Sequence, residues 1–268
     1  AGNLLGFLLR RAQTDQEPAS TYTQAQQLSA GTSPEAPKKL GGRQIEKELR
    51  AMAQKNTAYE EIYQQRDSYP QSVLNALCNN PEMLPFVQGY LQADKKADGI
   101  LTGEECKEKI PLLLQWDTRW GYASYGRSDI GLSGCAPTCL SMVIIGLTRK
   151  TYATPDAIAS FAQEQGYYLE GTGTSWSLMT EGADSFGIHG QEIRLSERTM
   201  KEQLEEGHPV ICSVGPGDFT TEGHFIVLTG VQDGKIKVND PNCIRRSCLW
   251  DYETLAGQIK NLWAFTKK

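Results

Sequence analysis

The sequence has few histidines, no long apolar run and no concentrated positive charge. No run approaches the roughly 18–20 apolar residues that a membrane span requires, so no transmembrane segment is expected. Lysine and arginine number 27 against 32 aspartate and glutamate, a net charge of −5, and the basic residues form only short pairs. Nucleic-acid binding needs a concentrated basic surface and is therefore not expected. With only three histidines, few pairings of a base with a nucleophile are possible.

Cysteine is plentiful, and its number is odd. Of the seven cysteines, Cys78 could pair with Cys106, or Cys243 with Cys248, in an oxidising compartment, and the odd one left over suits a free thiol. The chain begins at Ala1 rather than with a methionine, which a cleaved signal peptide or a truncation would both explain. We therefore expect an extracellular or cell-surface protein.

The pattern of apolar residues divides the chain into three parts. Residues 1–42 are rich in Gln, Ser, Thr, Ala, Pro and Gly and lack an apolar period, which predicts a flexible tail or linker. Helical spacing then recurs three times, so residues 43–108 are expected to form a helical extension. This extension can bury little by itself and is expected to pack on the main domain, residues 109–268.

Helices and then strands are expected in the main domain. The run SGCAPTCLSMVIIGL predicts a buried helix, and further helices are expected after the capping residues Thr154, Thr174 or Ser175, and Ser196. Strands are expected at 209–214, 224–231 and 235–240, the last two joined around residues 233–234. Helices followed by a sheet indicate an α+β fold.

Cys135 opens the buried helix, with Pro137 in its first turn, where proline is tolerated. The attacking form of cysteine is the thiolate, which the free amides and partial positive charge of a helix start stabilise. A neighbouring imidazole can also take the thiol proton. Cys135 is therefore the candidate nucleophile, whereas Cys139 and Cys212 lie among apolar residues and are expected in the core.

His224 is the preferred base among the three histidines. It begins a strand directly after Gly223, where a side chain can project into a cleft. His208 is expected in an exposed turn before Pro209, and His189 in a loop or at a strand edge.

Asp240 ends the next strand, and the strand register decides whether it can orient His224. With a two-residue turn at 233–234, His224 would point to the opposite face from Asp240, because side chains alternate along strands. A three-residue loop, 232–234, with a bulge places Ile226 opposite Asp240 instead. We therefore predict an odd-length loop; an even-length loop with no bulge would contradict this role of Asp240.

Gln115 lies twenty residues before Cys135, between an apolar run and a tryptophan-rich turn. Its amide could donate to a developing oxyanion together with the backbone N–H of Cys135, the alternative being a surface glutamine. Trp116, Trp120 and Trp176 are expected to be packing residues, although Trp176 could line a cleft.

Four motifs in this order resemble the papain-like cysteine peptidases related to the bacterial bacteriocin-processing, double-glycine-leader peptidases: IPLLLQWDTRWGYASYG, SGCAPTCLSMV, GHFIVLTG and VNDPN. The resemblance covers about residues 109–266 and implies a papain-like catalytic domain, with the nucleophile helix packed on an antiparallel sheet. It implies these roles, with no cofactor and no metal: Cys135 as nucleophile, His224 as base, Asp240 as orienting acid and Gln115 in the oxyanion hole. The family commonly has glycine where Ala136 follows the nucleophile, a difference that leaves the chemistry intact.

These residues predict a hydrolase of the cysteine-peptidase type that cleaves peptide or amide bonds through a thioester on Cys135. Two other classes stay open. An acyltransferase, transpeptidase- or transglutaminase-like, would capture the same thioester with an amine, and a catalytically silent module would only bind peptides. We expect a peptide or protein substrate and a monomeric chain. The helical extension could also cover the cleft as a built-in inhibitor.

One further pattern lies outside these motifs. Residues 94–105, DKKADGILTGEE, place acidic residues and Gly99 at the spacing of an EF-hand calcium loop. Lys96 occupies a position that should supply an oxygen ligand, so a solvated linker is the preferred interpretation.

Overall fold

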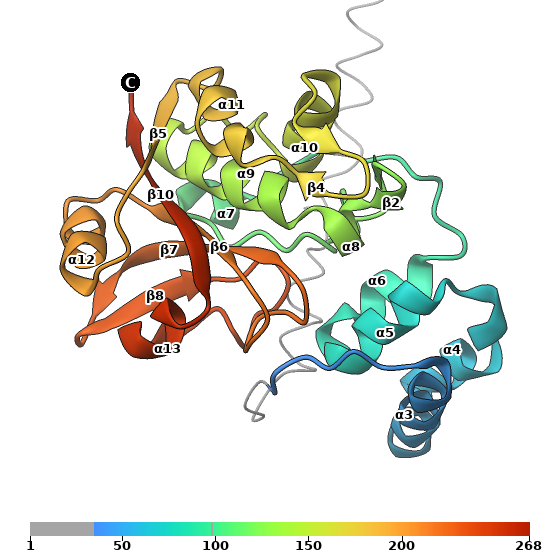
Figure 1. The fold of residues 1–268 in the computed structure, drawn as a ribbon. Helices are drawn as coiled ribbons and strands as arrows, with labels where there is room; N and C mark the ends of the chain where they lie inside the picture. The colour runs from blue at the N-terminus through green and yellow to red at the C-terminus, as the bar shows by residue number, and fades with distance from the viewer. Residues whose placement is uncertain (1–34, 98) are drawn as a thin grey trace, which may run out of the picture.

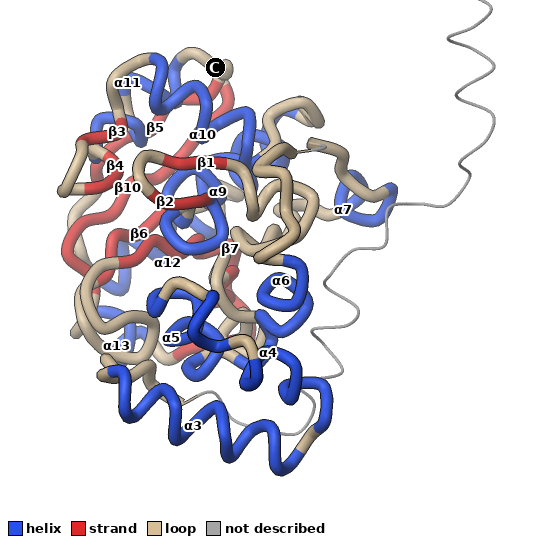
Figure 2. Tube along the Cα trace, turned by 90° about the vertical axis from the view of Figure 1, so that its right-hand side faces the viewer, coloured by secondary structure: helices blue, strands red, loops and turns tan. Residues whose placement is uncertain are grey.

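The computed structural model describes residues 35–97 and 99–268, so most of the predicted tail lies outside the described residues. Before residue 110 the chain is helical, with α3 (Gly42–Lys55), α4 (Glu60–Gln64), α5 (Gln71–Asn79), α6 (Leu84–Gly89), α7 (Gly103–Lys107) and 3₁₀ turns at Thr57–Tyr59, Arg66–Ser68 and Pro81–Met83. We call residues 42–89 the helical region. Figure 2 shows α3 at its outer edge, with α5 and α6 between α3 and the rest of the molecule.

Apolar spacing and local caps explain this helical region. Helix α3 turns Ile45, Leu49 and Ala53 inward at intervals of one turn. It ends at Asn56, whose side chain accepts a hydrogen bond from the backbone N–H of Ala58 and so starts a 3₁₀ turn. The break at Asn56 allows α4 to pack back against α3.

Residues 110–268 form a six-stranded antiparallel sheet in the order β5-β10-β6-β7-β8-β9. Its strands are β5 (Ile188–Glu192), β6 (Val210–Val214), β7 (His224–Gln232), β8 (Lys235–Asn239), β9 (Leu249–Trp250) and β10 (Ile259–Lys267). Two short hairpins lie apart from it, β1 (Ser124–Tyr125) with β2 (Ser128–Asp129), and β3 (Tyr168–Leu169) with β4 (Gly173–Thr174).

Helices cover both faces of the sheet. They are α8 (Ile130–Ser133), α9 (Cys135–Thr148), α10 (Pro155–Glu164), α11 (Glu181–Asp184), α12 (Glu197–Glu205) and α13 (Tyr252–Ala256). Figure 1 shows α9, α10 and α11 on one side of the sheet and α12 and α13 on the other. The expected α+β fold, with the helix that begins at Cys135 packed on an antiparallel sheet, is confirmed.

The expected strands are present, with two corrections among the helices. Thr154 occupies the N-cap position of α10, but its side chain makes no capping hydrogen bond. Ser196 caps α12 by accepting from the backbone N–H of Thr199, as expected. The single helix expected after Thr174 or Ser175 is wrong, because the chain forms a 3₁₀ turn at Trp176–Met179 and then the short α11. The break falls at Thr180, whose ψ of −84° leaves the helical range.

The turn between β7 and β8 is shorter than predicted. Gln232 pairs with Lys235, so only Asp233 and Gly234 form the turn. Both have positive φ, 52° and 76°, which is the geometry of a type I′ turn. The predicted odd-length loop is therefore wrong.

A bulge within β7 nevertheless produces the register that the odd-length loop was meant to supply. The pairing shifts by one between residues 228 and 230, which leaves Thr229 as the extra residue. As a result Val227 pairs with Asn239, and Ile226 rather than Val227 lies level with Asp240. The one-residue shift that lets Asp240 share a face of the sheet with His224 is therefore present, although the extra residue lies in the strand and not in the loop.

Three hydrophobic clusters hold these layers together. One lies between α9 and the sheet, and a second fills the other face under α12 and α13. The third belongs to the helical region, but it also takes in Leu114 and Trp116, the neighbours of Gln115. The helical region and the start of the main domain thus share one core. Within residues 35–97 and 99–268, no helix combines the length and hydrophobicity that a bilayer span requires.

Candidate active site

Cys135 lies at the junction of two helices. Helix α8 ends at Gly134, and α9 begins with Cys135 itself. A Cβ at Gly134 would lie 2.6 Å from the backbone oxygen of Ile130, so the junction admits only glycine without rearrangement. The thiol is half-buried at the N-terminus of α9, where the partial positive charge of the helix favours a thiolate.

His224 is the first residue of β7, and its ring is buried. Its Nε2 lies 2.7 Å from Oδ1 of Asp240. Burial disfavours the charged ring, but the carboxylate of Asp240 and then the side chain of Cys135 outweigh that effect, and the pKa of His224 rises to about 9. Because Asp240 occupies Nε2, the other ring nitrogen is the one left for the thiol.

Asp240 is fully buried, and both of its carboxylate oxygens accept hydrogen bonds. Its Oδ1 accepts from His224 and, at 2.8 Å, from the backbone N–H of Asn242. Its Oδ2 accepts from Nε of Arg246 at 3.1 Å. A buried carboxylate needs such partners, because an unpaired charge is costly away from water.

Gln115 connects the two sides of the site. Its backbone N–H donates to the carbonyl oxygen of Pro241 at 2.7 Å, and its Nε2 donates to that of Gly131 at 3.0 Å. The Nε2 group carries a second hydrogen, and Oε1 has no hydrogen-bond partner among the described residues. The amide therefore keeps unused hydrogen-bonding capacity where it borders the cleft.

Gln115, Cys135 and His224 all line one cleft of about 810 Å³. Its walls come from the helical region, the segments around Gln115 and Cys135, the β3–β4 hairpin, strand β6, the start of β7 with the residues before it, and the loop after Asp240. The wall residues include Ala76, Met83, Leu132, Thr174, Trp176, Phe219 and Glu222. Trp176, expected to be a packing residue that could line a cleft, does line it; it is 45% exposed and packs edge-on against Trp263 at 5.6 Å between ring centroids.

Two partners of the site escaped the sequence analysis. Arg246 is buried and pairs with Asp240, and Glu82 of the helical region is buried against the loop that follows Asp240. The only sequence signal for Arg246 is the pair Arg245-Arg246 six residues after the acid. Glu82 gives no signal, since it lies far from Asp240 in the chain.

The other histidines are engaged elsewhere. His189 lies on the edge strand β5 and faces Asp184 at 3.2 Å, in line with the strand-edge expectation. His208 follows α12 and lies 3.2 Å from Gln203, half-buried rather than fully exposed. Neither lines the cleft that holds Cys135.

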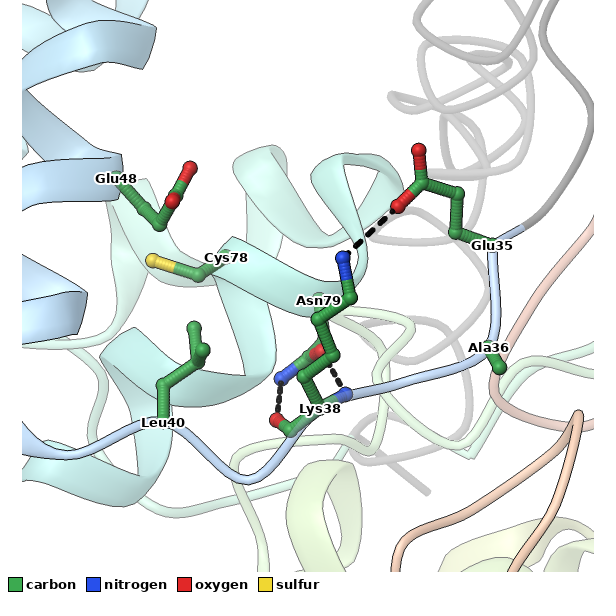
Figure 3. A pocket seen from close by; sticks show the side chains of 7 residues that line it. All are labelled: Glu35, Ala36, Lys38, Leu40, Glu48, Cys78 and Asn79. Atoms are coloured by element: carbon green, nitrogen blue, oxygen red, sulfur yellow. Dashed lines mark hydrogen bonds and ion pairs between the residues drawn. The ribbon is translucent and has the colours of Figure 1, made fainter.

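All seven cysteines lie in the described part of the chain, and all are free thiols. The two conceivable pairings, Cys78 with Cys106 and Cys243 with Cys248, are not formed. Cys139 and Cys212 are fully buried, as expected of core residues. Burial raises the pKa of Cys78 to about 12, and this thiol lines a small pocket of about 140 Å³ between α3, α5 and residues 35–40 (Figure 3).

The EF-hand-like segment is tied to the main domain through Glu105. Both carboxylate oxygens of Glu105 accept from the guanidinium of Arg119, at 2.7 and 2.8 Å. Arg119 also pairs with Asp117, and the three side chains are largely buried together. In the ranges 35–97 and 99–268, no group of three or more His, Cys, Asp and Glu residues is placed to hold a metal ion.

Comparison with known proteins identifies a family. A family model described as the Peptidase_C39 like family matches residues 107–268, more than half of the chain. No protein of curated function is similar enough in sequence to match.

Three solved structures are similar to parts of the chain. The peptidase domain of Streptococcus ComA, a bifunctional ABC transporter involved in quorum sensing, is 19% identical with a TM-score of 0.37, over 49% of this chain and 93% of that domain. A Bacillus anthracis protein described as a C39-like peptidase is 14% identical with a TM-score of 0.39, over 59% and 95%. A double-glycine-motif protease from an AMS/PCAT transporter, solved with a leader peptide, is 18% identical with a TM-score of 0.31, over 50% and 86%. The family model, rather than these distant structures, identifies the family.

Proposed function

The chain belongs to the Peptidase_C39 like family, and from this premise we propose that it is a cysteine peptidase that cleaves peptide bonds through a thioester on Cys135. The observation that carries the proposal is one connected arrangement: Cys135 and His224 line the same cleft, and Asp240 bonds the far side of the His224 ring.

Each side chain has a chemical role in this proposal. Cys135 is the nucleophile, held as a thiolate by the start of α9 and by protonated His224. Asp240 fixes the orientation of the ring and favours its charged form. Gln115 and the backbone N–H of Cys135 are the donors to the oxyanion.

The proposed reaction proceeds in two stages, formation of the thioester and its hydrolysis. The thiolate attacks the carbonyl carbon of the scissile bond, and the electron pair moves to the carbonyl oxygen facing Gln115. On collapse, His224 gives its proton to the leaving amine, and a thioester on Cys135 remains. Neutral His224 next takes a proton from water, which hydrolyses the thioester and frees the acid and the thiolate.

The substrate is a peptide or protein segment that can lie along the cleft. Apolar walls at Met83, Leu132 and Trp176 favour uncharged side chains, and the carboxylate of Glu222 on one rim is already paired with Lys39 at 2.7 Å. The extracellular or cell-surface location and the monomeric state stay predictions.

Mapping of iodoacetamide labelling by mass spectrometry tests the proposal. At pH 6 an ordinary thiol is almost entirely protonated, so selective labelling of Cys135 is expected only if the site stabilises a thiolate. The variant His224→Ala should lower the labelling rate by at least about 100-fold. The matched control His189→Ala, at a histidine outside the cleft, should label like the wild type.

Two outcomes count against the proposal. Labelling that follows the exposure of the seven cysteines, without preference for Cys135, favours a silent peptide-binding module. If Cys135 is selectively labelled, a peptide library in ¹⁸O-water separates the remaining classes. Incorporation of ¹⁸O at new carboxyl termini marks hydrolysis, while capture of an added amine marks acyl transfer.

A further inference from the structure

The loop that follows Asp240 supplies two of its three hydrogen-bond donors. The backbone N–H of Asn242 bonds Oδ1, and Nε of Arg246 bonds Oδ2. The loop, residues 241–246, lies outside regular strands and helices, so its conformation depends on what holds it. Anything that shifts it also shifts the carboxylate that orients His224.

Glu82, in the 3₁₀ turn between α5 and α6, binds the middle of this loop. Its Oε2 accepts from the backbone N–H of Ile244 at 2.7 Å, and its Oε1 accepts from the backbone N–H of Arg245 at 3.2 Å. The same Oε1 accepts from Nε of Arg245 at 3.0 Å and contacts the thiol of Cys243 at 3.6 Å. Glu82 is 0% exposed, so its carboxylate contacts these groups and not the solvent.

A second contact from the helical region fixes the start of the loop. Nδ2 of Asn80 donates to the carbonyl oxygen of Asn242 at 2.5 Å, and Nε1 of Trp116 donates to the same oxygen at 2.9 Å. Oδ1 of Asn80 also accepts from the backbone N–H of Glu82, which couples the two side chains. The loop is therefore held at Asn242, the residue whose N–H reaches Asp240, and again at Ile244 and Arg245.

The helical region also supports the opposite side of the cleft. The ring of Phe86 packs so closely on Gly131 that a Cβ there would lie 2.4 Å from its Cζ. The carbonyl oxygen of Gly131 is the one that anchors the amide of Gln115. Phe86 also stacks on Tyr122 at 4.9 Å between ring centroids, and its carbonyl oxygen accepts from the hydroxyl of Tyr122.

We propose that Glu82 is a positioning residue for Asp240, and that the helical region is thereby part of the catalytic unit. Glu82 fixes loop 241–246, the loop fixes the carboxylate, and the carboxylate fixes His224. The inference rests on the proposed function for its catalytic meaning. It goes beyond the family, because the family model begins at residue 107 and Glu82 and Asn80 lie outside it.

The test is Glu82→Gln in the full chain. Glutamine has the same shape, but it replaces one acceptor oxygen with a donor that opposes the N–H groups of the loop. Titration of the histidines by long-range ¹H–¹⁵N NMR reports on His224 without any substrate, and three histidines are readily assigned by substitution. In the wild type the pKa of His224 is expected near 9, raised by Asp240, and in Glu82→Gln it should fall by at least one unit.

Labelling of Cys135 provides the second measurement. With the His224 ring less well held, the pair of thiolate and charged imidazole weakens against the neutral pair. Glu82→Gln should therefore label Cys135 more slowly at neutral pH, by up to about tenfold for each pKa unit that His224 loses. The control Glu61→Gln alters an exposed glutamate of the same helical region and should match the wild type in both measurements.

A milder variant covers the case in which Glu82→Gln does not fold. Asn80→Ser keeps an oxygen that can cap Glu82 but removes the donor to Asn242. It should change the titration of His224 and the labelling rate in the same direction by a smaller amount. A folded variant with wild-type titration and wild-type labelling overturns the proposal.

The measurements also separate this proposal from the proposed function. If Cys135 of the wild type is unreactive but Glu82→Gln still changes the titration of His224, the positioning role stands and the peptidase proposal fails. If the variants label faster than the wild type, the helical region acts as the built-in inhibitor that the sequence left open, and the positioning role is rejected.

Discussion

At the scale of single residues, the site depends on where one proton resides. His224 and Asp240 are both buried, and such a pair could in principle share a neutral form. Arg246 adds a third charge on the far oxygen of Asp240. Burial disfavours the charged ring, but Asp240 and Cys135 raise the pKa of His224, so the proton is held on the ring. The sequence identified His224 and Asp240 from their positions at strand ends. Arg246 could not be found in that way, because its role depends on the folded shape of the loop.

This arrangement predicts a loss of stability at alkaline pH. The folded-state pKa of His224 is about 9, above the ordinary value of 6.5, so protonation of this residue stabilises the fold. The contribution is complete below pH 6.5 and is lost as the pH rises through about 9. In Asp240→Asn, burial lowers the pKa of His224, and this contribution disappears. Between pH 7 and 10, the melting temperature of the wild type should therefore fall further than that of Asp240→Asn, by at least about 5 °C, in thermal unfolding followed by circular dichroism.

An exposed histidine provides the control for this measurement. His189→Gln should retain the pH dependence of the wild type, because that residue pairs only at the surface. Parallel curves for the wild type and Asp240→Asn would show that His224 carries no stabilising proton.

At the scale of elements, the hairpin shows what a sequence can and cannot specify. The turn residues Asp233-Gly234 predicted the position of the reversal, and its type I′ geometry follows from their positive φ. The need for an odd shift in register was also predicted. Its location at Thr229 was not, because a bulge in mid-strand depends on how both faces of the sheet pack.

Strand β10 was missed altogether, and its burial explains why. Leu262 and Ala264 enter the cluster under α12, whereas Trp263 and Phe265 enter the cluster under α9. A strand buried on both faces shows no alternation of apolar and polar residues, which is the main sequence signal for a strand. The place of β10 inside the sheet, between β5 and β6, therefore gave no alternating pattern in the sequence.

The α8–α9 junction makes a prediction of its own. In Gly134→Ala the new methyl group would collide with the backbone of Ile130, so the start of α9 must shift. We expect a destabilisation of about 1–3 kcal/mol in urea unfolding and slower iodoacetamide labelling of Cys135. Gly230→Ala is the control, since a Cβ there meets nothing within 4 Å. Equal behaviour of the two variants would mean that the junction does not fix the nucleophile.

At the scale of the whole molecule, the boundary near residue 108 separates two sequence patterns but not two cores. The family model begins at residue 107, and the apolar pattern also changes there. Leu114 and Trp116 nevertheless complete the cluster of the helical region, and Phe86 packs on Gly131 beside the site. Sequence predicted that the extension packs on the main domain. It could not show that the contact reaches both Gln115 and the loop after Asp240.

A shared core predicts that the two parts unfold together. Of the five tryptophans, only Trp116 enters the cluster of the helical region, so tryptophan fluorescence reports mainly on the main domain, while far-ultraviolet circular dichroism also reports on the helical region. The two urea unfolding curves of the wild type should coincide. Phe86→Ala removes a buried ring that bridges the two parts and should move both curves together, by about 3–5 kcal/mol. If only the circular dichroism curve moves, the helical region is an independent unit, and its hold on Asp240 cannot depend on the common core.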